Sequence, residues 1–151
     1  MSTILGIDPG KAGGIAWIQS GRAQCEKMPA TLQDIWNLLR DIQREATGPM
    51  FAYLEKVGAM PGQGVTSMFT FGQGYGALEM ALIGWGIPFE RVTPQAWQKK
   101  LSCLTGGNKN VSKARAQELF PALKITHAVA DCLLIAEYGR RAQTAEHSQP
   151  A

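Results

Sequence analysis

Three acidic residues stand in apolar segments that could bring them together. Asp8 ends the run TILGID, Glu55 lies in MFAYLEKV, and Asp131 lies in HAVADCLLIA. Charged side chains are rare in buried segments, and neighbouring carboxylates repel one another unless a cation joins them. Carboxylate oxygens of this kind suit Mg²⁺ or Mn²⁺. His127 lies four residues before Asp131 and therefore shares its helix face. Together these four residues predict a divalent-metal site.

Each of these residues alone has an ordinary structural explanation. Asp8 precedes Pro9-Gly10 and could be a turn residue, and His127 could bond a backbone group at the start of a helix. Glu55 and Asp131 are harder to explain in this way, because apolar residues surround both of them. The joint pattern is therefore more specific than any one of its members.

Five short apolar segments are predicted to be strands, at residues 3–8, 14–18, 22–28, 50–57 and 87–92. Helices are expected at about 32–46, 67–85, 94–101, 112–119 and 127–141, with Thr31, Ser112 and Thr126 as candidate N-caps. Short turns join the first three strands into an antiparallel meander. The fourth and fifth strands are reached through helices and should lie parallel to the first. The expected fold is an α/β domain whose mixed five-stranded sheet has helices on both faces.

This topology gives the acids a common location. If the first and fourth strands are parallel neighbours, Asp8 and Glu55 both lie near their carboxyl ends, where α/β folds bind ligands. The small residues Ala128 and Ala130 let the last helix approach the sheet closely.

Length and composition are those of a single domain. The chain has 151 residues and is 45% hydrophobic, so one core is expected. We assign residues 1–142 to the domain and residues 143–151 to a flexible tail. Three widely spaced cysteines favour neither a disulfide framework nor a zinc site. The sequence shows no secretory signal and no apolar run long enough to span a bilayer, so a cytoplasmic location is expected.

Basic residues are concentrated between residues 91 and 124, where the sequence contains seven Lys and Arg and a single acid, Glu118. Such a block is typical either of a polyanion-binding surface or of a solvated helical face. The candidate phosphate contacts are Lys11, Lys99, Lys100, Lys109, Lys113 and Arg115.

Several other chemistries are excluded. Three residues separate Gly6 from Gly10-Lys11, and Ala12 follows the lysine, so this is not a phosphate-binding loop. The glycines at 72, 74 and 76 lack the dinucleotide-binding spacing. No base is visibly placed beside a serine or cysteine nucleophile. A sugar or acetate kinase-like ATPase also begins with such a hairpin, but it needs a second lobe for which this chain is too short.

Several motifs, in this order, resemble those of the RuvC-type Holliday junction resolvases in the ribonuclease H-like superfamily. They are GIDPG with the following GIA strand, YLEKV, the glycine-rich GQGYGALEMALIGWGIP, VTPQAWQKKL, GNKNVSKARAQ and HAVADCLLIA. The resemblance runs from Ile4 to about Tyr138. It implies a ribonuclease H-like fold, and the short length and compact loops are similar to phage-borne members.

By position, the resemblance implies that Asp8, Glu55 and Asp131 hold two Mg²⁺ or Mn²⁺ ions and that His127 is the fourth site residue. This chain departs from the family pattern in two ways. Many members place the fourth residue three positions before the last acid, where this chain has Ala128. Bacterial members also carry an aromatic residue after the second acid, which stacks at the junction centre. Met60, Phe69 or Phe71 are the candidates for that role here.

The function implied is paired nicking of four-way DNA junctions by a homodimer, because a twofold enzyme matches a twofold substrate. Gly72, Gly76 and Met80, spaced by four, would let two glycine-rich helices approach closely, although the glycines could equally pack that helix on its own sheet. Two alternatives remain open. One is a broader branched-DNA or RNA–DNA hybrid nuclease of the same fold, and the other is a non-catalytic junction-binding protein.

Overall fold

Within residues 1–58, 62–148 and 150, which the computed structural model describes, five strands form one mixed sheet. They are β1 (Thr3–Asp8), β2 (Gly14–Gln19), β3 (Arg22–Lys27), β4 (Met50–Glu55) and β5 (Phe89–Val92), in the order β3-β2-β1-β4-β5. β1 pairs antiparallel with β2, and β2 with β3, whereas β1–β4 and β4–β5 are parallel. The predicted topology is confirmed.

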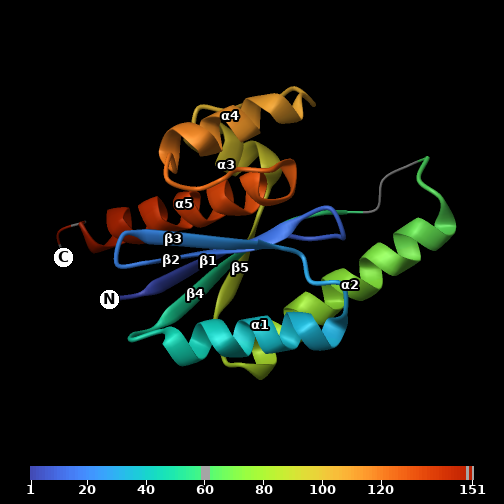
Figure 1. Cartoon of the computed structure of the whole chain (residues 1–151), viewed down its shortest axis with the longest axis horizontal. Helices are drawn as coiled ribbons and strands as arrows, with labels where there is room; N and C mark the ends of the chain where they lie inside the picture. Colours follow the sequence, from blue (N-terminus) through green and yellow to red (C-terminus); the bar gives the residue numbers. More distant parts are fainter. Residues whose placement is uncertain (59–61, 149, 151) are drawn as a thin grey trace.

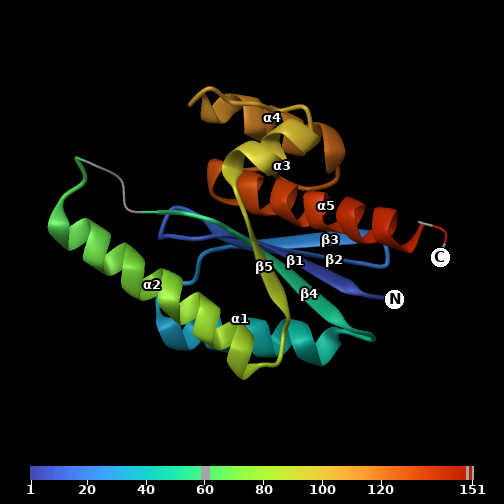
Figure 2. The same ribbon diagram turned by 180° about the vertical axis from the view of Figure 1, so that it is seen from behind.

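Helices cover both faces of this sheet. They are α1 (Leu32–Glu45), α2 (Val65–Gly84), α3 (Pro94–Lys100), α4 (Lys109–Leu119) and α5 (His127–His147). α1 and α2 lie on one face and α3, α4 and α5 on the other (Figures 1 and 2). Each layer has its own buried apolar cluster. α2 reaches past the edge of the sheet (Figure 1). None of the described helices is both long and apolar enough to cross a membrane.

α5 packs directly against the central strand because β1 carries a glycine at the crossing point. A Cβ added at Gly6 would lie 2.2 Å from the backbone nitrogen of Ala136 and 2.3 Å from the carbonyl oxygen of Cys132. No side chain fits in that space, so the glycine permits the close approach. This contact fixes α5 relative to the end of β1, and therefore fixes Asp131 relative to Asp8.

Side chains cap three of the five described helices, α1, α3 and α4, whereas α2 and α5 begin at Gly64 and at the predicted cap Thr126 without a side-chain cap bond. Thr31 caps α1 as predicted, because its Oγ1 accepts a hydrogen bond from the backbone N–H of Asp34 at 3.0 Å. α4 begins earlier than predicted, at Lys109, and its cap is Asn108 instead of Ser112. The Asn108 side chain accepts from the backbone N–H of Asn110, whereas Ser112 is buried inside the helix. Ser112 does not serve as the cap because it is 3% exposed and its hydroxyl donates to the Lys109 carbonyl one turn earlier in the helix.

The last helix is longer than predicted. α5 continues to His147, beyond the expected end at about Arg141, so residues 143–147 are helical. Two contacts explain the extension. Gln143 Nε2 donates to the Tyr53 hydroxyl at 3.0 Å, and Thr144 Oγ1 donates to the carbonyl of Arg140. The first of these ties the polar end of the helix to β4.

Candidate active site

The three acids lie at one edge of the sheet, where parallel strands β1 and β4 end. Asp8 is the last residue of β1 and Glu55 the last of β4, and the register pairs Ile7 with Leu54 immediately before them. Asp131 lies near the N-terminus of α5, which packs on β1. Residues remote in the sequence therefore meet as the topology predicts.

A cavity of about 190 Å³ opens at this edge. Its lining includes two of the acids together with the predicted histidine, and consists of Asp8, Pro9, Ala12, Gly13, Lys109, Ser112, His127 and Asp131. Glu55 does not line this cavity and lies beside it. His127 is the first residue of α5 and is exposed at the rim.

The carboxyl groups disfavour one another's ionised forms. Burial, followed by the charges of Glu55 and Asp131, raises the pKa of Asp8 to about 8, although Lys109 opposes this shift. Burial and the charge of Asp131 also raise the pKa of Glu55, against a hydrogen bond from Trp97. Without a further cation, the three groups cannot all be ionised at neutral pH.

Asp131 is the acid whose neighbours most favour its ionised form. Burial raises its pKa, whereas the nearby Ser112 hydroxyl and the charges of Lys109 and His127 act in the opposite direction. Lys109 was predicted to contact phosphate, and the structure places it in the acid cavity, where it offsets the charge of Asp8 and Asp131.

The chemistry of this donor set fits divalent cations. Three carboxylates and an imidazole supply hard ligands, and their raised pKa values are those of a cluster that needs positive charge. In the part of the chain that the structure describes, no three His, Cys, Asp or Glu side chains lie close enough to form a ready-made ion site. The fit therefore rests on the donor types and their mutual repulsion.

The other predicted phosphate contacts differ in how free their side chains are to reach a ligand. Lys11, Lys99 and Lys100 are exposed, and Lys113 is half-buried. Arg115 is committed to internal bonds, since its Nε donates to the Leu101 carbonyl at 2.9 Å and its guanidinium pairs with Glu118. Its guanidinium ties α4 to the end of α3.

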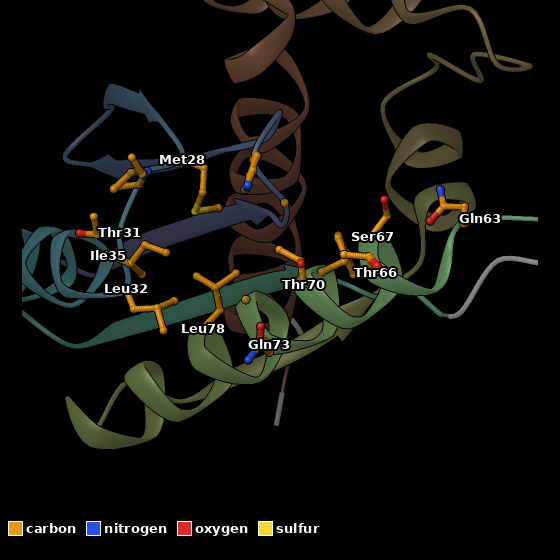
Figure 3. Close-up of a pocket in the computed structure, with 16 residues that line it drawn as sticks. Met28, Thr31, Leu32, Ile35, Gln63, Thr66, Ser67, Thr70, Gln73 and Leu78 are labelled. Carbon is orange, nitrogen blue, oxygen red and sulfur yellow. The ribbon is translucent and has the colours of Figure 1, made fainter.

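A larger cavity, of about 600 Å³, lies between α1, α2 and the β1–β2 turn (Figure 3). Apolar side chains such as Ile35 and Leu78 share its lining with polar residues of α2 such as Thr70 and Gln73 (Figure 3). None of the three acids lines this cavity. Asp8, His127 and Asp131 line the smaller cavity instead.

The predicted junction-stacking residues occupy different environments. Phe71 is half-buried against Tyr75 and also lines the larger cavity, whereas Phe69 is 68% exposed. Met60 lies outside the described residues. An exposed aromatic residue is thus available on α2, one turn after its start.

Sequence reasoning missed two side chains that lie beside the acids. Trp97 Nε1 donates to Glu55 Oε2 at 2.7 Å, and Ser112 lines the same cavity as Asp131 while its hydroxyl donates to the Lys109 carbonyl at 3.1 Å. Trp97 lies in the quoted VTPQAWQKKL motif, and a buried indole N–H always needs an acceptor. That signal indicates an acceptor without saying which one, because Glu55 is 42 residues away.

The whole chain superposes on solved structures of one kind of protein. T. thermophilus RuvC in complex with a Holliday junction substrate matches with a TM-score of 0.67 at 17% identity, covering 98% of this chain and 97% of that chain. The chain has a RuvC-like fold. A second Thermus thermophilus RuvC structure matches with a TM-score of 0.63 at 16% identity, covering 94% of this chain and 97% of the other. No protein-family model and no curated protein matches the sequence.

The RuvC-like fold confirms the predicted ribonuclease H-like architecture over nearly the full length. At these identities the likeness concerns the fold, and the roles of individual residues rest on their own geometry and charge.

Proposed function

We propose that this protein is a divalent-metal-dependent endonuclease that resolves four-way DNA junctions by paired nicks. The observation that carries the proposal is the gathering of three half-buried acids, Asp8, Glu55 and Asp131, at the open end of a RuvC-like sheet, where burial and then the neighbouring charges raise the pKa of Asp8. An acid cluster with raised pKa values is typical of a functional site. The Thermus neighbour bound to a Holliday junction supports branched DNA as the substrate class.

In this proposal the three acids and His127 hold two Mg²⁺ or Mn²⁺ ions. When bound, such ions supply an activated water nucleophile and stabilise the charge that develops on the leaving 3′ oxygen. Asp8, which interacts with both other acids, is the proposed shared ligand, and Glu55 and Asp131 each favour one ion. His127 at the cavity rim would either ligate one of the ions or orient the attacking water.

The basic residues have a different proposed task. Lys109 supplies positive charge inside the cavity and is suited to a phosphate oxygen of the cleaved strand. Lys11, Lys99, Lys100 and Lys113 contact flanking phosphates, which position DNA without reading its sequence. Arg115 would contribute only at the cost of its bonds to Leu101 and Glu118.

The exposed face of α2 supports a homodimer. An apolar or small residue recurs at spacings of four and three along this helix, forming an α2 stripe of Val65, Phe69, Gly72, Gly76, Met80 and Ile83. The four larger members are exposed, with Met80 at 64%. A Cβ at Gly72 or Gly76 would meet nothing within 4 Å, so these glycines are not needed for packing on their own sheet. Such a stripe suits close helix–helix contact with a second copy.

The dimer is tested by analytical ultracentrifugation of wild type, Gly76→Glu and Gly74→Glu. Gly74 is the matched control, because it lies on the same helix, also has open space around it, and is outside the α2 stripe. We expect wild type and Gly74→Glu to be dimers and Gly76→Glu to be a monomer. A monomeric wild type at micromolar concentrations would end the dimer proposal.

The function is tested by incubating the protein with synthetic DNA and Mg²⁺. The panel contains a four-way junction, a three-way junction, a flap and an RNA–DNA hybrid. Symmetric nicks in the four-way junction, faster than cleavage of the other substrates, are expected. Equal cleavage of all forms would indicate a broader nuclease, and tight junction binding without any nick would indicate a non-catalytic binding protein.

The cytoplasmic location and the phage origin of the protein stay predictions.

A further inference from the structure

Trp97 combines complete burial with a polar contact to the acid cluster. Its side chain has 0% exposure, and its indole N–H donates to Glu55 Oε2 at 2.7 Å. This length is typical of a hydrogen bond to an ionised acceptor. Tryptophan has a single donor and no acceptor, so the direction of the bond is fixed.

The local backbone brings Trp97 to Glu55 through the neighbouring strand. Glu55 is paired in register with Val92, and the N–H of Lys56 donates to the Val92 carbonyl at 2.7 Å. α3 starts immediately afterwards, with Thr93 as its cap and Pro94 at its first position. Trp97 therefore lies one helical turn into the helix that follows β5, whose last residue pairs with the last residue of β4.

Both partners of this bond are held by further contacts. The Trp97 ring packs in the buried cluster that includes Leu101 and Leu133, so it cannot move without disturbing the core. The Tyr75 hydroxyl donates to the backbone carbonyl of Glu55 at 3.1 Å. The main chain and the side chain of Glu55 are thus fixed by separate aromatic residues from α2 and α3.

We propose that Trp97 is a positioning residue that orients Glu55 for cation binding. Its N–H occupies one carboxylate oxygen and leaves the other oxygen available to a divalent cation. The Glu55 rotamer is then ordered before a cation arrives, which removes an ordering cost from binding. This inference rests on the proposed metal-dependent function, and it assigns a role to a residue that contacts neither cation nor substrate.

A purely structural role makes a different prediction. If Trp97 only fills the core, its N–H needs an acceptor but Glu55 does not need the N–H. An isosteric side chain without the donor would then leave cation binding unchanged. Benzothienylalanine has the shape of tryptophan with sulfur in place of the N–H, and it separates the two roles without creating a cavity.

The experiment measures Mn²⁺ affinity from the electron paramagnetic resonance signal of free Mn²⁺. The proteins are wild type, Trp97→benzothienylalanine, Trp97→Phe and the control Trp85→Phe. Trp85 also loses an indole bond, which its Nε1 donates to the Trp36 carbonyl at 3.2 Å. We expect Mn²⁺ affinity to fall about tenfold or more in both Trp97 variants and to stay within about twofold in the control.

A second readout needs no cation and no activity. The ¹H–¹⁵N spectrum of the metal-free protein contains four indole signals, one for each tryptophan, and Trp97→Phe identifies the signal of Trp97. Glu55→Gln should shift this signal upfield, since an amide accepts a weaker hydrogen bond than a carboxylate, while the Trp85 signal stays in place.

The outcomes distinguish this inference from the proposed function. If wild type binds Mn²⁺ and the benzothienylalanine protein binds it equally well, the positioning role of Trp97 is refuted and the metal site stands. If wild type binds no Mn²⁺, both proposals fail. An indole signal that does not respond to Glu55→Gln would refute the hydrogen bond itself.

Discussion

Replacing Asp8 by Asn should stabilise the metal-free protein, although this residue is central to the proposed site. Asp8 has a pKa of 3.8 in an exposed setting and about 8 in the folded protein, chiefly because of burial and then because of Glu55 and Asp131. Near neutral pH the unfolded group is ionised while the folded group is mostly protonated. Folding therefore takes up a proton, and the free energy of unfolding falls as the pH rises from about 4 to about 8.

The magnitude follows from the two pKa values. Each pKa unit corresponds to about 1.4 kcal/mol, so at pH 7 the wild-type group lowers the free energy of unfolding by at most about 4 kcal/mol. The neighbouring acids also titrate and share the repulsion. We therefore expect Asp8→Asn to be more stable than wild type by about 2–4 kcal/mol at pH 7 and by almost nothing near pH 4.

The assay is urea unfolding in the presence of EDTA at several pH values between 4 and 8. Asp41→Asn is the control, because Asp41 is 56% exposed on α1 and its surface ion pair with Arg40 contributes little to stability. Saturating Mg²⁺ should reverse the order, since a cation that binds only folded wild type stabilises it. A stability difference that is constant with pH, or a wild type that gains stability as the pH rises, would refute the reasoning.

Other substitutions test how α5 is held. Burial raises the pKa of Glu137, but bonds from Arg140 and Arg141 outweigh it and lower the pKa overall. Glu137→Gln should therefore lose about 1–3 kcal/mol at pH 7. Urea unfolding should show this loss shrinking as the pH falls from the ordinary carboxyl pKa of 4.5 through the lowered pKa of the folded group. Gly6→Ala should lose about 3 kcal/mol or more, because its Cβ would clash with the α5 backbone. Gly74→Ala, which meets nothing within 4 Å, should instead gain about 0.5–1 kcal/mol, and equal unfolding midpoints for the two glycine variants would contradict the close packing of β1 on α5.

The architecture was predictable because local patterns and topology rules agree. The apolar runs of β1 and β4, with a short turn after the first and a helix before the second, fix their parallel pairing. The convergence of Asp8, Glu55 and Asp131 at one edge of the sheet follows from that pairing and from the apolar face of α5.

The structure differs from the sequence-based prediction where tertiary contacts override local signals. Asn108 and Ser112 are both suitable caps, and the helix includes Ser112 because this residue is buried and its hydroxyl bonds the Lys109 carbonyl within α4. The polar residues after Arg141 read as a tail, but the bond from Gln143 to Tyr53 keeps them helical. The partner of Trp97 could not be deduced, because its acceptor comes from a different strand.

The most direct test of the central claim compares DNA cleavage with DNA binding for wild type and Asp8→Asn. Both proteins are given a synthetic four-way junction, with Mg²⁺ to measure nicking and with Ca²⁺ to measure binding by gel shift. If the acid cluster performs the chemistry, Asp8→Asn binds the junction with wild-type affinity and produces no nicks. Cleavage by Asp8→Asn at the wild-type rate would remove Asp8 from the mechanism and contradict the account.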